Sequence, residues 1–132
     1  MSKINGSVER GTWSLHTPLN AVTATTTSSA VPIAGAKRIT WAFTRADHSS
    51  GSTSFAVTVS LDGTTFVTYN KLIDNVTNTN AQTLTRVASS SLSSDTTKVY
   101  SMDLEHDAYV EMKVTATETT DGTHTAKCLI EF

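Results

Sequence analysis

Residues 54–69, SFAVTVSLDGTTFVTY, constrain the fold of this chain more than any other stretch. The apolar residues of its first half alternate with small polar ones: Phe55, Val57, Val59 and Leu61. Asp62-Gly63 then supplies a turn, and a second β-rich run follows. This arrangement predicts a β-hairpin with one buried face. Because a single hairpin is not stable in water, the rest of the chain must supply further strands.

Hydroxyl side chains are the unusual feature of the composition. The 132 residues include 25 Thr and 16 Ser, and only 17% of the residues are charged. Threonine suits a half-exposed strand, whereas Ser and Thr in such numbers disfavour helices. With a formal net charge of −2, the chain lacks the basic footprint expected of a nucleic-acid partner or of an anionic membrane surface.

Two further segments alternate clearly, residues 37–44 and 98–104. Each places three apolar side chains on one face: Ile39, Trp41 and Phe43 in the first, and Tyr100, Met102 and Leu104 in the second. Between the first of these and the hairpin, residues 45–53 read as a loop. We expect about seven to nine short strands and no substantial helix. This predicts an all-β fold, a single antiparallel β-sandwich of jelly-roll-like type, with a small closed barrel as the alternative.

The domain plan has two parts, an N-terminal arm of residues 1–12 and a β-sandwich domain of residues 13–132. Trp13 and Leu15 begin a first strand that is expected to end near Thr17-Pro18. Residues 21–27 suit either an edge strand or an extended arm. In the polar stretch 70–96, one strand is expected around residues 82–88.

The C-terminal third suggests a second hairpin. Residues 110–116 and 126–132 each carry four apolar side chains on one face, and Asp121-Gly122 lies between them. A three-residue loop of residues 120–122 would pair Val114 with Cys128 and bring the two apolar sets to the same side, whereas a two-residue loop would not.

The same rule, applied to the first hairpin, predicts the loop Leu61-Asp62-Gly63. It pairs Val57 with Val67 and Phe55 with Tyr69, and it points Phe66 outward. A two-residue loop would bury Phe66 instead.

Motifs that carry chemistry are missing from the sequence. The four histidines have no metal-binding spacing, and neither a nucleophile elbow nor a phosphate-binding glycine loop is present. The acidic cluster Asp103, Glu105, His106 and Asp107 is read as a solvated turn rather than a calcium site. Cys128, within an alternating strand, is read as a small buried hydrophobic residue rather than a reactive thiol. We expect no enzymatic activity, no metal and no cofactor.

Candidate interaction residues are the aromatic side chains that the strand register leaves exposed, and the two apolar residues of the polar arm: Trp13, Phe66, Tyr109, Ile4 and Val8. Exposed aromatic residues suit a protein interface or stacking against a sugar. The alternative is that Trp13 packs under the sandwich edge and the other two aromatic residues cap the core.

Three segments carry a family resemblance: VTVSLDGTTFV at 57–67, KVYSMDL at 98–104, and YVEMKVTATETTDGTHTAKCLIEF at 109–132. In the order and style of its elements, the stretch 37–132 resembles small Thr/Ser-rich β-sandwich proteins of tailed bacteriophage particles, of the head decoration or accessory type. The resemblance implies a non-enzymatic virion structural protein that binds and reinforces the assembled particle, often as a symmetric homo-oligomer. Its partners would be virion structural proteins such as the major capsid protein, and its arm would become ordered on a neighbouring subunit.

A second resemblance is shorter. Ser60, Asp62, Gly63 and Phe66 match a piece found in discoidin-like carbohydrate-binding sandwiches, which implies an adhesin or receptor-binding module that binds glycans. The chain departs from those proteins because its one cysteine allows no internal disulfide pair. The N-terminal residues also show no signal peptide, so we expect synthesis in the host cytoplasm and a final location in the virion.

Overall fold

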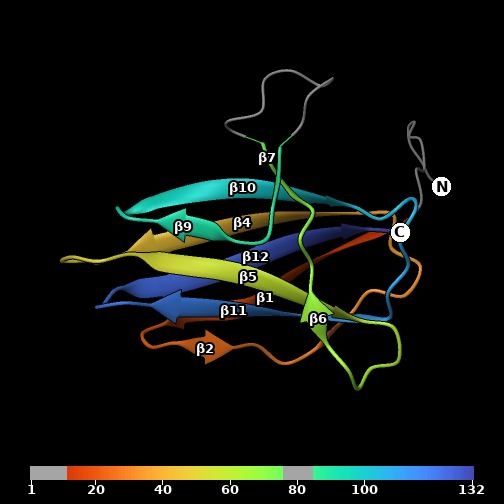
Figure 1. Ribbon diagram of the computed structural model, residues 1–132, viewed down its shortest axis with the longest axis horizontal. Coiled ribbons are helices and arrows are strands. Elements are labelled where there is room, and N and C mark those ends of the chain that lie inside the picture. Colours follow the sequence, from red (N-terminus) through yellow and green to blue (C-terminus); the bar gives the residue numbers. More distant parts are fainter. Residues whose placement is uncertain (1–11, 76–84) are drawn as a thin grey trace.

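The computed structural model describes residues 12–75 and 85–132, which form two antiparallel β-sheets packed face to face (Figure 1). The first sheet has the order β1 (Trp13–Val22), β12 (Thr123–Glu131), β4 (Arg38–Ala46), β10 (Thr96–Asp103), β7 (Leu72–Asp74) and β8 (Arg86–Val87). The second has the order β2 (Thr26–Thr27), β11 (Glu111–Glu118), β5 (Thr53–Ser60) and β6 (Val67–Thr68), while β3 (Val31–Pro32) also pairs with β11 and β9 (Ser90–Leu92) with β5. The predicted all-β sandwich is confirmed, but the described residues form twelve strands rather than seven to nine.

The core lies between the two sheets and follows the alternation of the sequence. In β4 the inward residues Ile39, Trp41 and Phe43 are completely buried, whereas the residues between them are partly exposed. Phe43 stacks on Phe55 of β5 with ring centroids 4.7 Å apart and planes inclined by 7°. Aromatic pairs of this kind stabilise a fold by more than the burial of their surface area alone would give. This pair therefore joins the centres of the two sheets.

The predicted C-terminal hairpin is wrong. β11 pairs with β5 in the second sheet, and Val114 lies opposite Val57, while β12 lies between β1 and β4 in the first sheet. The turn at Asp121-Gly122 therefore carries the chain from one sheet to the other (Figure 1). Val110, assigned to the buried face, is 37% exposed.

The first hairpin exists, but its predicted register is wrong by two residues. Val59, not Val57, lies opposite Val67, and the amide of Tyr69 donates to the carbonyl oxygen of Val57 at 2.8 Å. The connection is longer than three residues because the Asp62 carboxylate accepts hydrogen bonds from the amides of Thr64 and Thr65. Matching the apolar faces of the two strands does not take this side-chain turn into account. These bonds also hold the pKa of Asp62 below its usual value of 3.8.

Near the N-terminus the first strand is longer than expected. β1 continues through Pro18 to Val22, with irregular pairing on β12 between His16 and Leu19 and again between Leu19 and Val22. Proline fits here because an edge strand needs only half of its backbone amides for pairing. Of the expected strand at 82–88, the described part contains β8. Residues 1–11, which make up most of the predicted arm and include Ile4 and Val8, lie outside the described residues.

Candidate interaction surfaces

One end of the sandwich is organised by a buried arginine. Arg45 continues the inward alternation of β4, and its side chain is fully buried. Its guanidinium donates four hydrogen bonds to backbone carbonyls: Ser50 at 2.7 Å, Gly51 at 2.9 Å, Asp121 at 2.9 Å and Leu92 at 3.2 Å. These carbonyls belong to the β4–β5 loop, the β11–β12 loop and β9. A single cation therefore ties three segments of the two sheets together.

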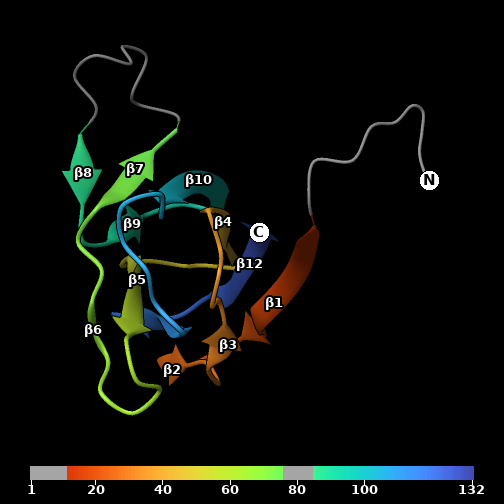
Figure 2. The ribbon, with the colours of Figure 1, turned by 90° about the vertical axis from the view of Figure 1, so that its right-hand side faces the viewer.

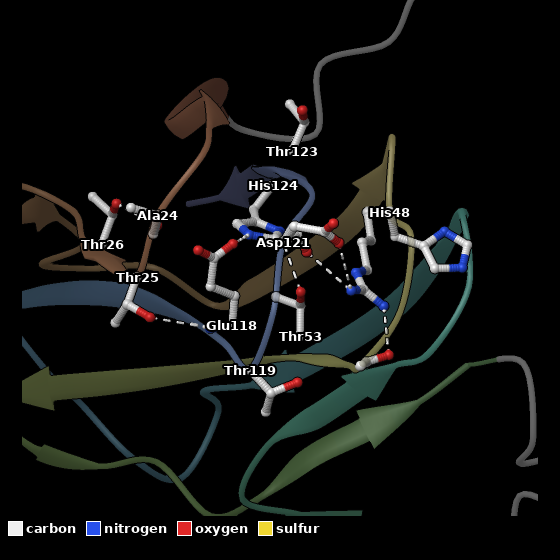
Figure 3. A network of polar contacts seen from close by, with 12 residues as sticks. Ala24, Thr25, Thr26, His48, Thr53, Glu118, Thr119, Asp121, Thr123 and His124 are labelled. Carbon is white, nitrogen blue, oxygen red and sulfur yellow. Dashed lines mark hydrogen bonds and ion pairs between the residues drawn. The ribbon is translucent and has the colours of Figure 1, made fainter.

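A buried histidine lies at the same end (Figure 3). His124 belongs to β12 and its side chain is completely buried. Its Nε2 is 2.7 Å from Oε2 of Glu118, and its Nδ1 is 3.3 Å from the hydroxyl of Thr53. Buried polar groups are costly unless they are paired, and both ring nitrogens are paired here. The contact links β12 of the first sheet to β11 and β5 of the second.

Two exposed carboxylates hold the β4–β5 loop in place. Asp121 accepts hydrogen bonds from the hydroxyl and the amide of Ser49, the latter at 2.9 Å. Asp95 accepts the amide of His48 at 3.2 Å and also contacts the His48 ring. Hydrogen bonds to the charged form favour it. The bonds from Ser49 accordingly lower the pKa of Asp121, and those from His48 lower the pKa of Asp95.

These carboxylates predict a loss of stability in acid. Because the folded protein holds the pKa of Asp121 below 3.8, this group stabilises the fold at neutral pH. That contribution is lost as the pH falls from 3.8 through the lower folded-state value. We expect Asp121→Asn to lower the free energy of unfolding at neutral pH and to have a smaller effect well below pH 3.8. Urea unfolding of both proteins at the two pH values measures this, and an equal loss at both would contradict it.

The polar end was missed by sequence reasoning, which placed Arg45 in a loop because residues 45–53 are rich in Ser, Asp and Gly. The signal that could have found it is spacing, since Arg45 is two residues beyond Phe43 on the inward face. Apart from Nε of Arg45, the buried polar atoms of Arg45 and His124 have partners within the network. Among the residues that the structure describes, no group of three or more His, Cys, Asp or Glu side chains could hold a metal ion.

The acidic cluster and Cys128, which the sequence analysis considered as a metal site and a reactive thiol, also have structural roles. Asp107 pairs with Lys71 at 3.0 Å, and Asp103 accepts the amide of Glu105. Cys128 is 1% exposed, and burial raises the pKa of its thiol to about 12, as expected for a small hydrophobic residue of the core. No helix in the described ranges is long and apolar enough to cross a membrane.

The outer face of the first sheet carries the main exposed apolar surface. Trp13 and Leu15 of β1 are each 66% exposed, and Leu129 of β12, directly opposite Leu15, is 39% exposed. We call these three residues the β1 patch. Trp13 therefore does not pack under the sandwich edge. A large exposed tryptophan beside two leucines is a feature of protein-binding surfaces.

A charged depression adjoins the β1 patch. Trp13 lies opposite Glu131 of β12, which lies opposite Arg38 of β4, and Arg38 in turn lies opposite Asp103 of β10. Arg38 donates to the Glu131 carboxylate at 2.7 and 2.9 Å. Glu131, Arg38 and Asp103 line an open depression of about 450 Å³ together with Lys37 and Glu105. The outer face thus changes from apolar at β1 to charged at β10.

The other two predicted aromatic residues do not join this surface. Phe66 is half-buried, and the Lys113 ammonium lies 4.3 Å from its ring centroid. Tyr109 packs against the core and makes an edge contact with Tyr69, with ring centroids 6.3 Å apart. Burial raises the pKa of Tyr69 to about 12. The structure therefore distributes Trp13, Phe66 and Tyr109 over three places rather than one site.

Comparison with known proteins gives one informative result. No family model and no curated protein matches the sequence. The fold, however, is that of a solved structure, the SPBc2 prophage-derived protein YomS, with a TM-score of 0.70. The match covers 96% of this chain and 98% of that one, at 12% sequence identity. The chain is therefore a two-sheet β-sandwich protein whose architecture also occurs in a prophage-derived protein.

Proposed function

We propose that this protein is a non-enzymatic structural protein of a bacteriophage particle. Its role is that of a capsid decoration or accessory virion protein, which binds and reinforces the assembled particle as a homo-oligomer. The fold shared over nearly the whole length with a prophage-derived protein supports the phage origin. The family resemblance of residues 37–132 points in the same direction.

The observation that carries the proposal is the β1 patch. In the row that continues from Leu129, the next two outer side chains carry hydroxyls, Thr40 and Ser101. The patch is apolar and exposed, and it lies on strands rather than on loops. Such a surface suits contact with another protein. Tryptophan is among the residue types that most often supply the binding energy of such contacts.

Carbohydrate binding would use the same tryptophan, but the surroundings of Trp13 favour protein. A sugar site pairs a stacking ring with polar groups that orient hydroxyls. Glu131 lies opposite Trp13, but its carboxylate already accepts from Arg38, and the adjacent row carries Leu15 and Leu129. Within the proposal, the major capsid protein is the candidate particle contact. The arm of residues 1–12 would contribute to it through Ile4 and Val8.

Co-sedimentation with particles tests the proposal. Purified protein is mixed with particles of the encoding phage that lack it, and the bound fraction is measured after gradient centrifugation. We expect binding that Trp13→Ala weakens and that Leu61→Ala, a change at an exposed leucine of the β5–β6 loop, leaves unchanged. Absence of the protein from purified particles, together with a glycan-array signal that Trp13→Ala abolishes, would overturn the proposal in favour of a lectin.

A further inference from the structure

The free edge of β1 presents unpaired backbone groups beside the β1 patch. Within residues 12–75 and 85–132, β1 is the terminal strand of the first sheet, and β12 pairs with it on one side only. The amide of Phe132 donates to the carbonyl of Thr12 at 2.8 Å, which makes Thr12 and Phe132 a hydrogen-bonded pair of the ladder. Such pairs alternate along an antiparallel ladder, so the backbone groups of Trp13 and Leu15 point away from β12, toward the free edge, before the regular pairing ends at His16.

The first part of the β1 edge lacks the usual protection against pairing. Edge strands are normally guarded by charged side chains, by prolines or by bulges. The ten residues of β1 include no Asp, Glu, Lys or Arg. Pro18 and the irregular pairing that follows His16 protect the second half of the strand, but the regularly paired residues Trp13–His16 have neither a proline nor a bulge. Figure 2 shows β1 as the outermost strand on its flank of the sandwich.

We propose that two copies of this chain associate through β1, pairing antiparallel about a two-fold axis at Leu15. Several registers place free amides opposite free carbonyls. The register centred on Leu15 pairs Leu15 with Leu15 of the second copy and places Trp13 opposite Thr17 of the second copy. The Leu15 pair exchanges two hydrogen bonds, and the first sheets of both copies become one continuous sheet.

The side chains agree with this register. Alternation places Trp13, Leu15 and Thr17 on the outer face, where all three are exposed. Across the axis, the two copies of Leu15 would lie side by side and would each be flanked by Leu129 of the same copy. The two β1 patches therefore merge into one apolar stripe, while each Trp13 covers a threonine methyl group. Because β1 carries no formal charge, no like charges meet at the axis.

This pairing gives the proposed homo-oligomer a defined form, a two-fold dimer through β1. Its biological role rests on the proposed function. Sedimentation equilibrium of the full chain tests it. We expect a dimer, and we expect Leu15→Glu to raise its dissociation constant by about a hundredfold, because two carboxylates would then face each other at the axis. The matched control is Leu61→Glu, the same change at a leucine that is 73% exposed but far from β1, and it should leave the dimer unchanged.

Disulfide trapping tests the register and does not depend on the folding of the Leu15→Glu variant. In the proposed pair, the Cα atoms of the two Leu15 residues are about 5.5 Å apart, within disulfide reach, so Leu15→Cys should cross-link on mild oxidation. The two Thr17 residues are about 13 Å apart along the strands, so Thr17→Cys should not cross-link. The native Cys128 is buried and does not interfere.

Three results would overturn the pairing: a monomeric wild-type chain, an oligomer that Leu15→Glu leaves intact, or cross-linking of Thr17→Cys as readily as of Leu15→Cys. A different result would contradict the proposed function. It would appear as a lack of binding in the particle co-sedimentation, whatever the oligomeric state of the free chain.

Discussion

Replacing Arg45 by methionine should lower the free energy of unfolding by about 3–5 kcal/mol, because the buried cation is part of a hydrogen-bonded network that spans both sheets. Methionine matches the length of the arginine stem but donates no hydrogen bond. The carbonyls of Ser50, Gly51, Leu92 and Asp121 would then lose their donor at the end of the core. Leu92 is buried, and a buried acceptor without a partner bears its full desolvation cost, whereas the carbonyls of Ser50, Gly51 and Asp121 each lose a hydrogen bond to a charged donor. Urea unfolding monitored by tryptophan fluorescence measures the change.

Arg38→Met is the matched control, since it removes the same side chain from the same strand. Arg38 also contacts a carboxylate, that of Glu131, but the side chains of this ion pair are 61% and 41% exposed. Exposed ion pairs contribute at most about 1 kcal/mol. If the two variants lost similar stability, the structural role assigned to Arg45 would be wrong.

Phe43→Ala should cost about 3–5 kcal/mol of unfolding free energy, the range for removing a fully buried aromatic side chain. Phe43 is completely buried and touches three rings: Trp41 with centroids 5.4 Å away, Phe55 at 4.7 Å and Tyr100 at 5.6 Å. These neighbours come from both sheets and are held by their own strands, so they cannot close over the space that the ring leaves. Thermal and urea unfolding both report the loss.

Phe66→Ala is the corresponding control. Phe66 is half-buried and contacts Lys113, and we expect this change to cost about 1 kcal/mol or less. Equal losses for Phe43 and Phe66 would show that the stacked rings do not join the sheets as the structure indicates.

Hydrophobic alternation predicted most of the side chains that enter the core, with exceptions at strand ends such as Val110 and Leu61. Ile39, Trp41 and Phe43 face inward, as do Met112 and Val114 of β11. The reason is physical: the side chains of a strand alternate strictly, so a buried face leaves a period of two in the sequence. The same principle explains the correct expectation of an all-β sandwich.

Alternation did not predict which strands are neighbours. Two strands that face each other across a sandwich carry the same inward pattern as two strands of one hairpin, so the apolar sets of β11 and β12 fit both arrangements. What separates them is the loop, where Asp121 and Gly122 lie against Arg45. This contact depends on a residue distant in sequence, and no local pattern contains it.

The candidate site was predictable only in part. Trp13 was a candidate for exposure beside the alternative that it packs under the sandwich edge, and the structure decides for exposure. Leu15 and Leu129 were not recognised as its neighbours, because their contact depends on the pairing of β1 with β12. Arg45 was missed because it begins a segment rich in Ser, Asp and Gly that reads as a loop. A long cation with several carbonyls around it can satisfy all of them from within the core.

The pairing of β1 with β12 also affects how the chain reaches its fold. In the first sheet, β12 separates β1 from β4, so the earliest described strand has no neighbour until the last has been made (Figure 1). Ribosomes add about 5–20 residues per second, and β-topologies rich in distant contacts fold in milliseconds to seconds. Synthesis of the segment between β4 and the end of β12 is therefore slower than folding itself. The first sheet is therefore complete only after translation has passed Glu131, and until then β1 and one edge of β4 lack their neighbour β12.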